Sequence, residues 1–396
     1  MFTSQRLIFY YAVTPVHMGA GQALGVIDNP IQRERHTEHP SYASSGIKGA
    51  FRDEAQNQWN SESLVNRIFG PDRDASDHAG AVSFTDAQLV AFPVRSLKGV
   101  YVYVTSPLLL QRLLRLAAIA GVPFPDPPQP TLQQGEGAAI PEASAAQSVM
   151  TDTATAARPQ EADRNPIPTP QDNQAVVIND QLITRIAGQG QNNNGKLVLE
   201  SFTFTPLTTD SEKRRLKTIA TWISASIFPN DPAWKFFKRK FQKDLVLVSD
   251  DQLTYFARNA TLIEPHVRIN DISGTSDEGG LFFTENLPPE ALMAGLVMAS
   301  EERLKKGSER TQEHFNSEKV MEKVVAAFDR KTVQIGGDAT TGRGRILVGF
   351  AKPMYSDKHP QQQGVDEAPI VEAVQNPTNT PVPSQQQELP TEGGRS

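Results

Sequence analysis

The spacing of apolar and polar residues predicts alternating strands and helices along most of the chain. Residues 6–15 (RLIFYYAVTP) read as a strand that runs into a loop, and residues 100–105 (VYVYVT) alternate with period two, which is typical of a strand. Residues 45–58 show apolar spacing of i, i+3 and i+4, which predicts a short helix. Pro107 opens a second helix, and Gly121 closes it.

The same reading extends through the second half of the chain. It predicts a long hairpin at 262–285 with a Gly-rich turn, and a segment at 291–299 that could be strand or helix. The other expected elements are strands at 81–93, 196–206, 244–249, 332–337 and 346–350 and helices at 210–227, 250–258 and 316–329. Strands separated by helices and hairpins, without a regular βαβ rhythm, favour an α+β fold with a ferredoxin-like sheet and insertions.

Proline is concentrated in two segments, which also carry most of the negative charge. Residues 122–172 hold ten of the 29 prolines and a net charge of −5, and residues 353–396 carry −4. Both are poor in aromatic residues, so we expect a disordered insertion over 122–179 and a disordered tail over 353–396. One folded domain would then comprise residues 1–121 and 180–352.

This division changes the meaning of the overall charge. The chain has 396 residues and a formal charge of −6, which alone argues against a nucleic-acid-binding protein. Without the two acidic segments the remainder carries about +3, an ordinary surface that no longer opposes RNA binding. The chain has no cysteine, which excludes disulfides and thiolate chemistry. It shows no apolar run long enough for a membrane span and no signal peptide, so we expect a cytoplasmic protein.

The loop after the first strand is the first candidate site. It carries three glycines in nine residues, and these permit close approach by a ligand. His17 precedes the glycines, Asp28 stands before Asn-Pro, and Arg33 follows. Asp28 is a candidate catalytic residue, but an Asp before Asn-Pro is more often a turn residue. His17 has an equally plain reading as a satisfied loop histidine.

Three more segments could contact an anionic ligand. In the helix at 45–58, Ser44 or Ser45 could be the N-cap, and Lys48 and Arg52 project from one face near its N-terminus, where phosphate binds readily. An ordinary solvated face is an equally good reading of these residues. The Gly-rich loop between two strands suits a backbone nest for a phosphodiester, although a structural turn is the alternative. Its candidate residues are Gly336, Gly337, Thr340, Thr341, Arg343 and Arg345.

The hairpin at 262–285 is the fourth candidate. His266 and Arg268 are two residues apart on the outgoing strand, so they point to the same side of it. The return strand brings an apolar Leu-Phe-Phe sequence. Such a hairpin could wedge between bases or act as a dimerisation arm.

Four blocks in a fixed order resemble a known family. They are TPVHMGAG…GVIDNPIQRERHT…SGIKGAFRDE, FPVRSLKGVYVYVTSPLLLQRL, EGGLFFTENLPPE and QIGGDATTGRGR. Together they are similar to the repeated backbone subunits of type III-B (Cmr) CRISPR effectors, which are members of the RAMP superfamily. The resemblance covers most of 6–121 and 196–351, and leaves out the two acidic segments.

The resemblance implies a modified ferredoxin-like (RRM) palm with a thumb hairpin. It implies partners: guide RNA, target RNA, further copies of the chain and other effector subunits. It also implies antiviral defence by cleavage of guide-paired target RNA, with Asp28 and His17 as catalytic residues and Asp28 as a ligand of a divalent metal, Mg or Mn. The other candidate residues, from Arg33 to Arg345, would bind RNA.

Two other readings stay open. The chain could be a non-catalytic guide-binding scaffold, with Asp28 a turn residue. A guide-processing ribonuclease is a weaker option, because the sequence shows no cluster of His, Tyr and Lys for it.

Overall fold

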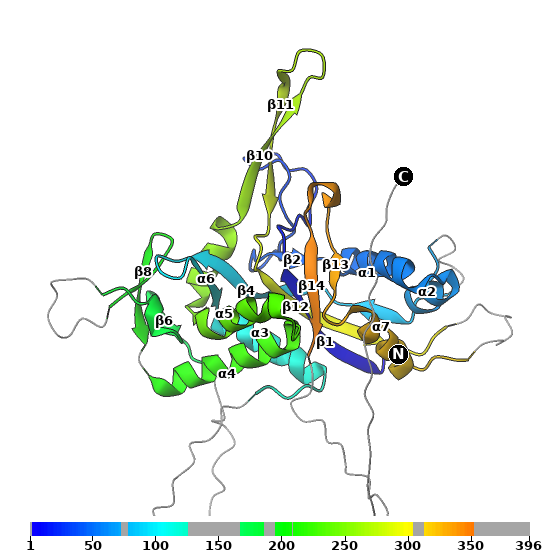
Figure 1. Ribbon diagram of the computed structural model, residues 1–396, viewed down its shortest axis with the longest axis horizontal. Coiled ribbons are helices and arrows are strands. Elements are labelled where there is room, and N and C mark those ends of the chain that lie inside the picture. The colour runs from blue at the N-terminus through cyan, green and yellow to red at the C-terminus, as the bar shows by residue number, and fades with distance from the viewer. Residues whose placement is uncertain are drawn as a thin grey trace, which may run out of the picture. The chain divides into compact units, whose positions relative to one another are not determined.

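A computed structural model describes residues 2–72, 78–125, 167–185, 195–207, 209–303 and 313–351. Its body is a 12-stranded mixed sheet, from which a two-stranded hairpin projects (Figure 1). The strands of the sheet are β1 (Ser4–Ala12), β2 (Ser41–Tyr42), β3 (Val82–Phe84), β4 (Ala87–Arg95), β5 (Tyr101–Thr105), β6 (Gln174–Val177), β7 (Leu197–Leu199), β8 (Phe202–Leu207), β9 (Leu245–Leu247), β12 (Leu292–Ala299), β13 (Thr332–Gln334) and β14 (Arg345–Phe350). The hairpin consists of β10 (Leu262–Ile269) and β11 (Ser276–Asn286).

The helices cover both faces of the sheet. They are α1 (Ser44–Trp59), α2 (Glu62–Phe69), α3 (Pro107–Ile119), α4 (Asp210–Ile227), α5 (Lys235–Asp244), α6 (Asp250–Asn259) and α7 (Ser317–Phe328), with short 3-10 turns η2 (Asp180–Leu182), η3 (Pro232–Trp234) and η4 (Ala339–Thr341). Phe51 of α1 packs on Phe328 of α7 in one core cluster, whereas α4 and α5 contribute to the other. The α+β class with a large mixed sheet is therefore confirmed.

Strand β1 explains why the N-terminal run has no polar alternation. It lies between β14 and β12, antiparallel to both, and β4 follows β12. Its side chains alternate between two core clusters, with Leu7, Phe9 and Tyr11 in one and Ile8, Tyr10 and Ala12 in the other. A strand buried on both faces needs apolar residues at every position.

Two expected strands are each divided in the structure. The segment at 81–93 becomes β3 and β4, separated at Thr85–Asp86. The segment at 196–206 becomes β7 and β8, which pair antiparallel after the chain reverses at Glu200. Glu200 has a φ of +49°, a left-handed conformation that permits the tight reversal and that the apolar pattern does not reveal.

The expected helices at 45–58, 107–120, 210–227 and 316–329 and the hairpin at 262–285 are present as α1, α3, α4, α7 and β10–β11. The ambiguous segment at 291–299 is strand β12. Helices α2 and α5 were not expected.

The prediction of disorder over 122–179 is wrong at both ends of that segment. Residues 174–177 form β6, which pairs with β8 and β9, and Ala175, Val176 and Val177 are fully buried. At the other end Phe124 packs on Trp222 of α4 with ring centroids 5.3 Å apart. These apolar runs are short, and the Pro- and Gln-rich residues around them give the whole segment the composition of a disordered region. Residues 126–166 and the tail from 352 onward lie outside the described residues.

Candidate functional site

The loop after β1 covers one edge of hairpin strand β11. The N–H of Asn29 donates to the carbonyl of Phe283, and the N–H of Glu285 donates to the carbonyl of Asn29, both at 3.0 Å. Oδ2 of Asp28 accepts from the N–H of Phe283 at 2.7 Å, and Nδ1 of His17 lies 2.8 Å from the carbonyl oxygen of Glu285. The loop thus satisfies four backbone groups on this edge and fixes both predicted catalytic residues at the base of the hairpin.

The position of His17 depends on glycines. A carbonyl only accepts, so Nδ1 donates its proton to Glu285 and a neutral ring offers Nε2 as an acceptor. A Cβ added at Gly19 would lie 2.8 Å from Nε2, and one at Gly336 would lie 2.6 Å from the carbonyl oxygen of His17. Gly336 also has a φ of +91°, and Gly337 donates its N–H to the His17 carbonyl at 2.9 Å. The spaces beside His17 therefore exclude side chains.

The Gly-rich loop between β13 and β14 lies directly against this first loop. The N–H of Gly344 donates to the carbonyl of Pro15 at 2.8 Å. Thr340 and Thr341 are exposed in η4, although the Thr341 hydroxyl donates to the carbonyl of Asp338 at 2.8 Å. The structure therefore brings together two predicted segments that are more than 300 residues apart.

The two arginines of this loop differ in their surroundings. Arg343 forms an ion pair with Glu264 of β10, and its side chain is only 13% exposed. Arg345 is exposed, and its side chain makes no hydrogen bond or ion pair with the described residues. Arg343 thus connects the loop to the hairpin, and Arg345 is the arginine that presents a free charge.

Glu285 joins the whole site, and sequence reasoning missed it. It is 3% exposed, and its Oε1 accepts from Nη2 of Arg33 at 2.5 Å and from the hydroxyl of Thr261 at 2.8 Å. Its Oε2 accepts from the N–H of Ile31 at 3.1 Å. Arg33 also donates to the carbonyl of Ala257. Its guanidinium is therefore occupied by contacts within the chain, which makes it a poor candidate for RNA binding. The one signal in the sequence was an acid directly after the apolar LFFT run.

The N-terminus of α1 lies beside the site, because a Cβ added at Gly46 would lie 3.3 Å from the side chain of Met18. The N-cap is Ala43 rather than Ser44 or Ser45, since Asp86 already accepts the N–H of Ser44 at 2.7 Å. Ser45 is exposed there.

The two predicted cations of α1 have different roles. Lys48 is half-buried, and burial lowers its pKa, with a further contribution from the neighbouring positive charge of Arg52. Lys48 makes no hydrogen bond or ion pair within the described part of the chain. Arg52 donates to Oδ1 of Asn66 at 2.8 Å and lies 3.8 Å from Asp72, so it connects α1 to α2.

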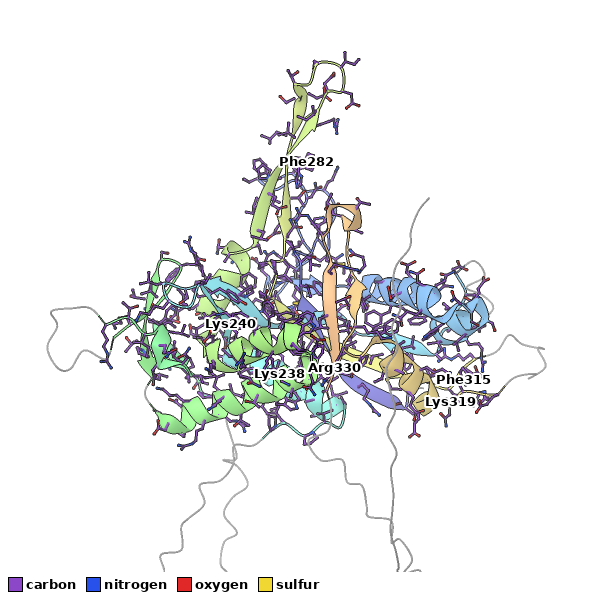
Figure 2. The ribbon with its side chains drawn as sticks, viewed as in Figure 1. Lys238, Lys240, Phe282, Phe315, Lys319 and Arg330 are labelled. Carbon is purple, nitrogen blue, oxygen red and sulfur yellow. The ribbon has the colours of Figure 1, made fainter. Side chains whose placement is uncertain are left out.

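On the hairpin, His266 stacks on Phe282 with ring centroids 5.1 Å apart and an interplanar angle of 16°. Arg268 is exposed farther out on the same strand, and no described residue pairs with its side chain. Both therefore lie above the base where Asp28 is fixed (Figure 2 labels Phe282).

Within the described ranges, no three His, Asp or Glu side chains gather in a way that could hold a metal ion. Asp28 is a single carboxylate, and one of its oxygens already accepts a backbone hydrogen bond. None of the described helices is long and apolar enough to cross a membrane.

Comparisons with known proteins identify the family of the chain. The sequence matches the family model of the RAMP superfamily over residues 9–347. It is 31% identical over 344 residues to the CRISPR system Cmr endoribonuclease Cmr4 of Pyrococcus furiosus, a match that covers 86% of this chain and 94% of that protein.

Solved structures show a similar fold. An oligomeric Cmr4 from Pyrococcus furiosus superposes with a TM-score of 0.56 at 23% identity, covering 88% of this chain and 98% of that one. A chain of the type III-B Cmr-beta complex bound to cognate target RNA gives a TM-score of 0.55 at 15% identity, with the same two coverages. On the family match and the identity to a full-length relative, the chain belongs to the RAMP superfamily.

Proposed function

We propose that the chain is the backbone subunit of a type III-B CRISPR effector, which binds guide RNA in several copies and cleaves complementary target RNA in the cytoplasm. The name of the Pyrococcus relative, an endoribonuclease, supports the activity. The descriptions of the similar structures, one oligomeric and one bound to target RNA within a complex, support the partners: further copies, other Cmr subunits and RNA.

The reaction is an attack of the target's own 2′-OH on the adjacent phosphate. The 2′-oxygen forms a bond to phosphorus while the bond from phosphorus to the 5′-oxygen breaks. The 2′-OH proton leaves to a base, and the departing 5′-oxygen receives a proton. The products are a 2′,3′-cyclic phosphate and a 5′-OH end. Alignment of these groups can contribute several kcal/mol, about 7–11 kcal/mol in favourable cases.

One observation carries the catalytic assignment. Asp28 and His17 each use one atom to cap the edge of β11, so Oδ1 of Asp28 and Nε2 of His17 make no hydrogen bond with the described residues. The capped residues, Phe283 and Glu285, are two apart on one strand, so the two side chains lie along the same edge of β11. The carboxylate could accept the 2′-OH proton, and a His17 ring protonated at both nitrogens could donate the Nε2 proton to the departing 5′-oxygen.

Metal dependence is also proposed, with Mg or Mn as the ion. Asp28 would be its one protein ligand among the described residues, and a single carboxylate binds such an ion weakly unless RNA oxygens complete the site. The proton transfers are therefore assigned to the side chains of Asp28 and His17.

RNA binding is assigned to the candidate cations that stay free. Lys48, Arg268 and Arg345 make no ion pair with described residues, whereas Arg33, Arg52 and Arg343 are occupied internally. Ser45, His266 and the Gly-rich loop would add contacts to the RNA backbone.

The finer fold assignment is a ferredoxin-like palm with the hairpin as thumb. Its support is the chain order β1, α1, β4, β12, α7, β14 and the antiparallel order β14-β1-β12-β4 in the sheet. Helices α1 and α7 share one face.

The test of the reaction uses the assembled effector with a matched target. A single 2′-deoxy substitution at the scissile nucleotide should abolish cleavage there and leave the other positions unchanged. Asp28→Ala should stop cleavage while target binding persists, and the isolated chain should cleave negligibly. Unchanged cleavage by Asp28→Ala would instead support the scaffold reading, in which Asp28 only caps β11.

A further inference from the structure

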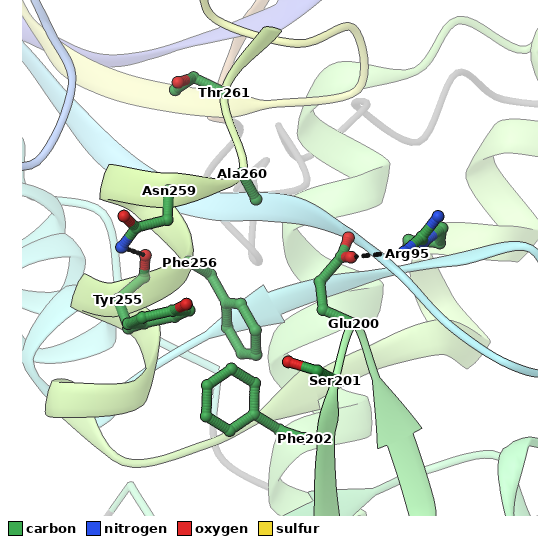
Figure 3. A pocket seen from close by; sticks show the side chains of 9 residues that line it. All are labelled: Arg95, Glu200, Ser201, Phe202, Tyr255, Phe256, Asn259, Ala260 and Thr261. Atoms are coloured by element: carbon green, nitrogen blue, oxygen red, sulfur yellow. Dashed lines mark hydrogen bonds and ion pairs between the residues drawn. The ribbon is translucent and has the colours of Figure 1, made fainter.

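A pocket of about 560 Å³ lies on the other side of the hairpin base. It opens between the end of α6, the reversal between β7 and β8, and the end of β4 (Figure 3). The candidate residues discussed above do not line it. Its size is in the range of small-molecule sites.

Aromatic rings form one wall of the pocket. The ring of Tyr255 packs edge-on against Phe202, with centroids 4.9 Å apart and an interplanar angle of 71°. Phe256 also packs against Phe202, with centroids 5.7 Å apart. Tyr255 is nevertheless 48% exposed. Its ring is thus fixed by packing and still offers surface on which a planar group can stack.

Polar groups lie on both sides of the pocket: Arg95 and Glu200 lie across from Tyr255, and Asn259 lies beside Tyr255 on α6 (Figure 3). Arg95, whose side chain is 78% exposed, pairs with Oε2 of Glu200 at 3.0 Å. Oε1 of Glu200 has no hydrogen-bond partner in the described part of the chain. Asn259 donates its amide N–H to the carbonyl of Tyr255 at 2.8 Å, which leaves its own Oδ1 as an acceptor. Glu200 itself has a left-handed φ, an uncommon conformation for this residue.

The pocket is physically connected to the proposed cleavage site. Thr261 lines the pocket, and its hydroxyl donates to Oε1 of Glu285 at 2.8 Å. The same Glu285 binds Asn29 and His17 through its backbone on the other side of β11.

We propose that this pocket binds one unpaired nucleobase of the RNA, stacked on Tyr255, with its exocyclic amino group donating to Glu200 or Asn259. This inference rests on the proposed function in that RNA must be present. Unstacked bases are characteristically held on aromatic side chains and read through their edges. The exposed guanidinium of Arg95 supplies a contact for the flanking phosphate.

The polar groups of the pocket favour a nucleobase over an apolar side chain from a neighbouring copy. A Leu or Val inserted here would desolvate Glu200 and Asn259 without satisfying them. A base with an exocyclic amino group can donate to the carboxylate, whereas uracil can donate only from N3–H, which is flanked by O2 and O4 that the carboxylate repels. The pocket should therefore prefer cytosine, adenine or guanine to uracil.

The test is photo-crosslinking in the assembled effector. Target and guide RNAs carry 5-iodocytidine or 5-iodouridine at one position, which is moved along the strand, and crosslinked peptides are identified by mass spectrometry. We expect a crosslink to Tyr255 at particular positions, stronger for cytidine than for uridine. Tyr255→Leu should reduce it about tenfold, as expected for a lost stacking contact. Tyr255→Phe keeps the ring and should keep the crosslink.

Glu200→Gln provides the second arm, because an amide can donate as well as accept. It should remove the preference for cytidine while the crosslink persists. Melting temperatures of all variants check that each is folded. No crosslink at any position, in an effector that still cleaves its target, would overturn the pocket assignment and leave the proposed function intact. A protein–protein crosslink from Tyr255 to a neighbouring copy would overturn it as well.

Discussion

The base and the outer half of the hairpin are built in opposite ways. At the base, Thr284, Glu285 and Asn286 are at most 4% exposed, and the loop after β1 satisfies the strand edge. Farther out, Val267 and Leu281 face each other across the strands at 47% and 57% exposure, and Ile272 near the tip is 98% exposed. The base is thus completed within the chain, whereas the outer half keeps apolar surface for a partner. The difference indicates that the proposed catalytic residues, Asp28 and His17, are held in position by the chain itself.

Removal of the buried carboxylate at the base should have the largest effect on stability. Glu285→Ala leaves Arg33 and the N–H of Ile31 without their partner, so we expect the free energy of unfolding to fall by about 3–5 kcal/mol. Glu264→Ala is the matched control, because its ion pair with Arg343 is partly exposed and should contribute about 1 kcal/mol or less. Chemical denaturation of the purified chain measures both. Equal losses would contradict a larger contribution of the buried Glu285 carboxylate than of the partly exposed Glu264 ion pair.

The outer half should show the reverse behaviour. Val267→Ser combined with Leu281→Ser should change the free energy of unfolding by no more than about 0.5 kcal/mol, because both side chains are already half exposed. In the assembled effector, cleavage of guide-paired target should nevertheless fall about tenfold, if the apolar surface contacts bases. A destabilised chain with normal cleavage would show that this surface serves the fold.

The turn after β11 should make the stability of the chain depend on pH. Burial raises the pKa of Glu290 from its ordinary value of 4.5 to about 7, so the folded chain holds a proton that the unfolded chain releases. Its contribution to stability is therefore complete below about pH 4.5 and is lost as the pH rises through 7. Glu290→Gln should show a smaller fall in melting temperature than the wild type between pH 5 and 8. The same fall in both would exclude Glu290 as the titrating group.

The smallest expected effect concerns a single RNA contact. Lys48→Gln beside the site should reduce the slope of log affinity against log salt by about one for binding of guide RNA. Lys238→Gln on α5, on the opposite face of the sheet from α1, should leave the slope unchanged. Filter binding across a salt series distinguishes them, and an unchanged slope for Lys48→Gln would remove it from the interface.

The sequence alone predicts the elements that depend on neighbouring residues, such as strand β1 from its apolar run and helix α1 from its helical spacing. It does not predict which side chains pair when they are far apart in the sequence. Arg33 and Arg343 looked like free cations, but their partners Glu285 and Glu264 lie 252 and 79 residues away.

The same limit explains why Glu285 was missed and why β6 was taken for part of a disordered segment. Glu285 is covered by the loop after β1, and β6 is covered by pairing with β8 and β9, so both depend on contacts between distant parts of the sequence. Asp28 and His17 are candidates from the Gly-rich loop, and the family resemblance implies their catalytic roles, but their shared attachment to β11 depends on the three-dimensional arrangement.

The most direct test of the account is the single-turnover cleavage rate of Asp28→Asn in the assembled effector. Asparagine keeps an oxygen that accepts the N–H of Phe283, so the loop should stay in place while the negative charge is lost. We expect a rate about 10²–10⁴-fold lower with target affinity unchanged. A rate equal to the wild type would contradict it, because Asp28 would then serve only to cap the hairpin.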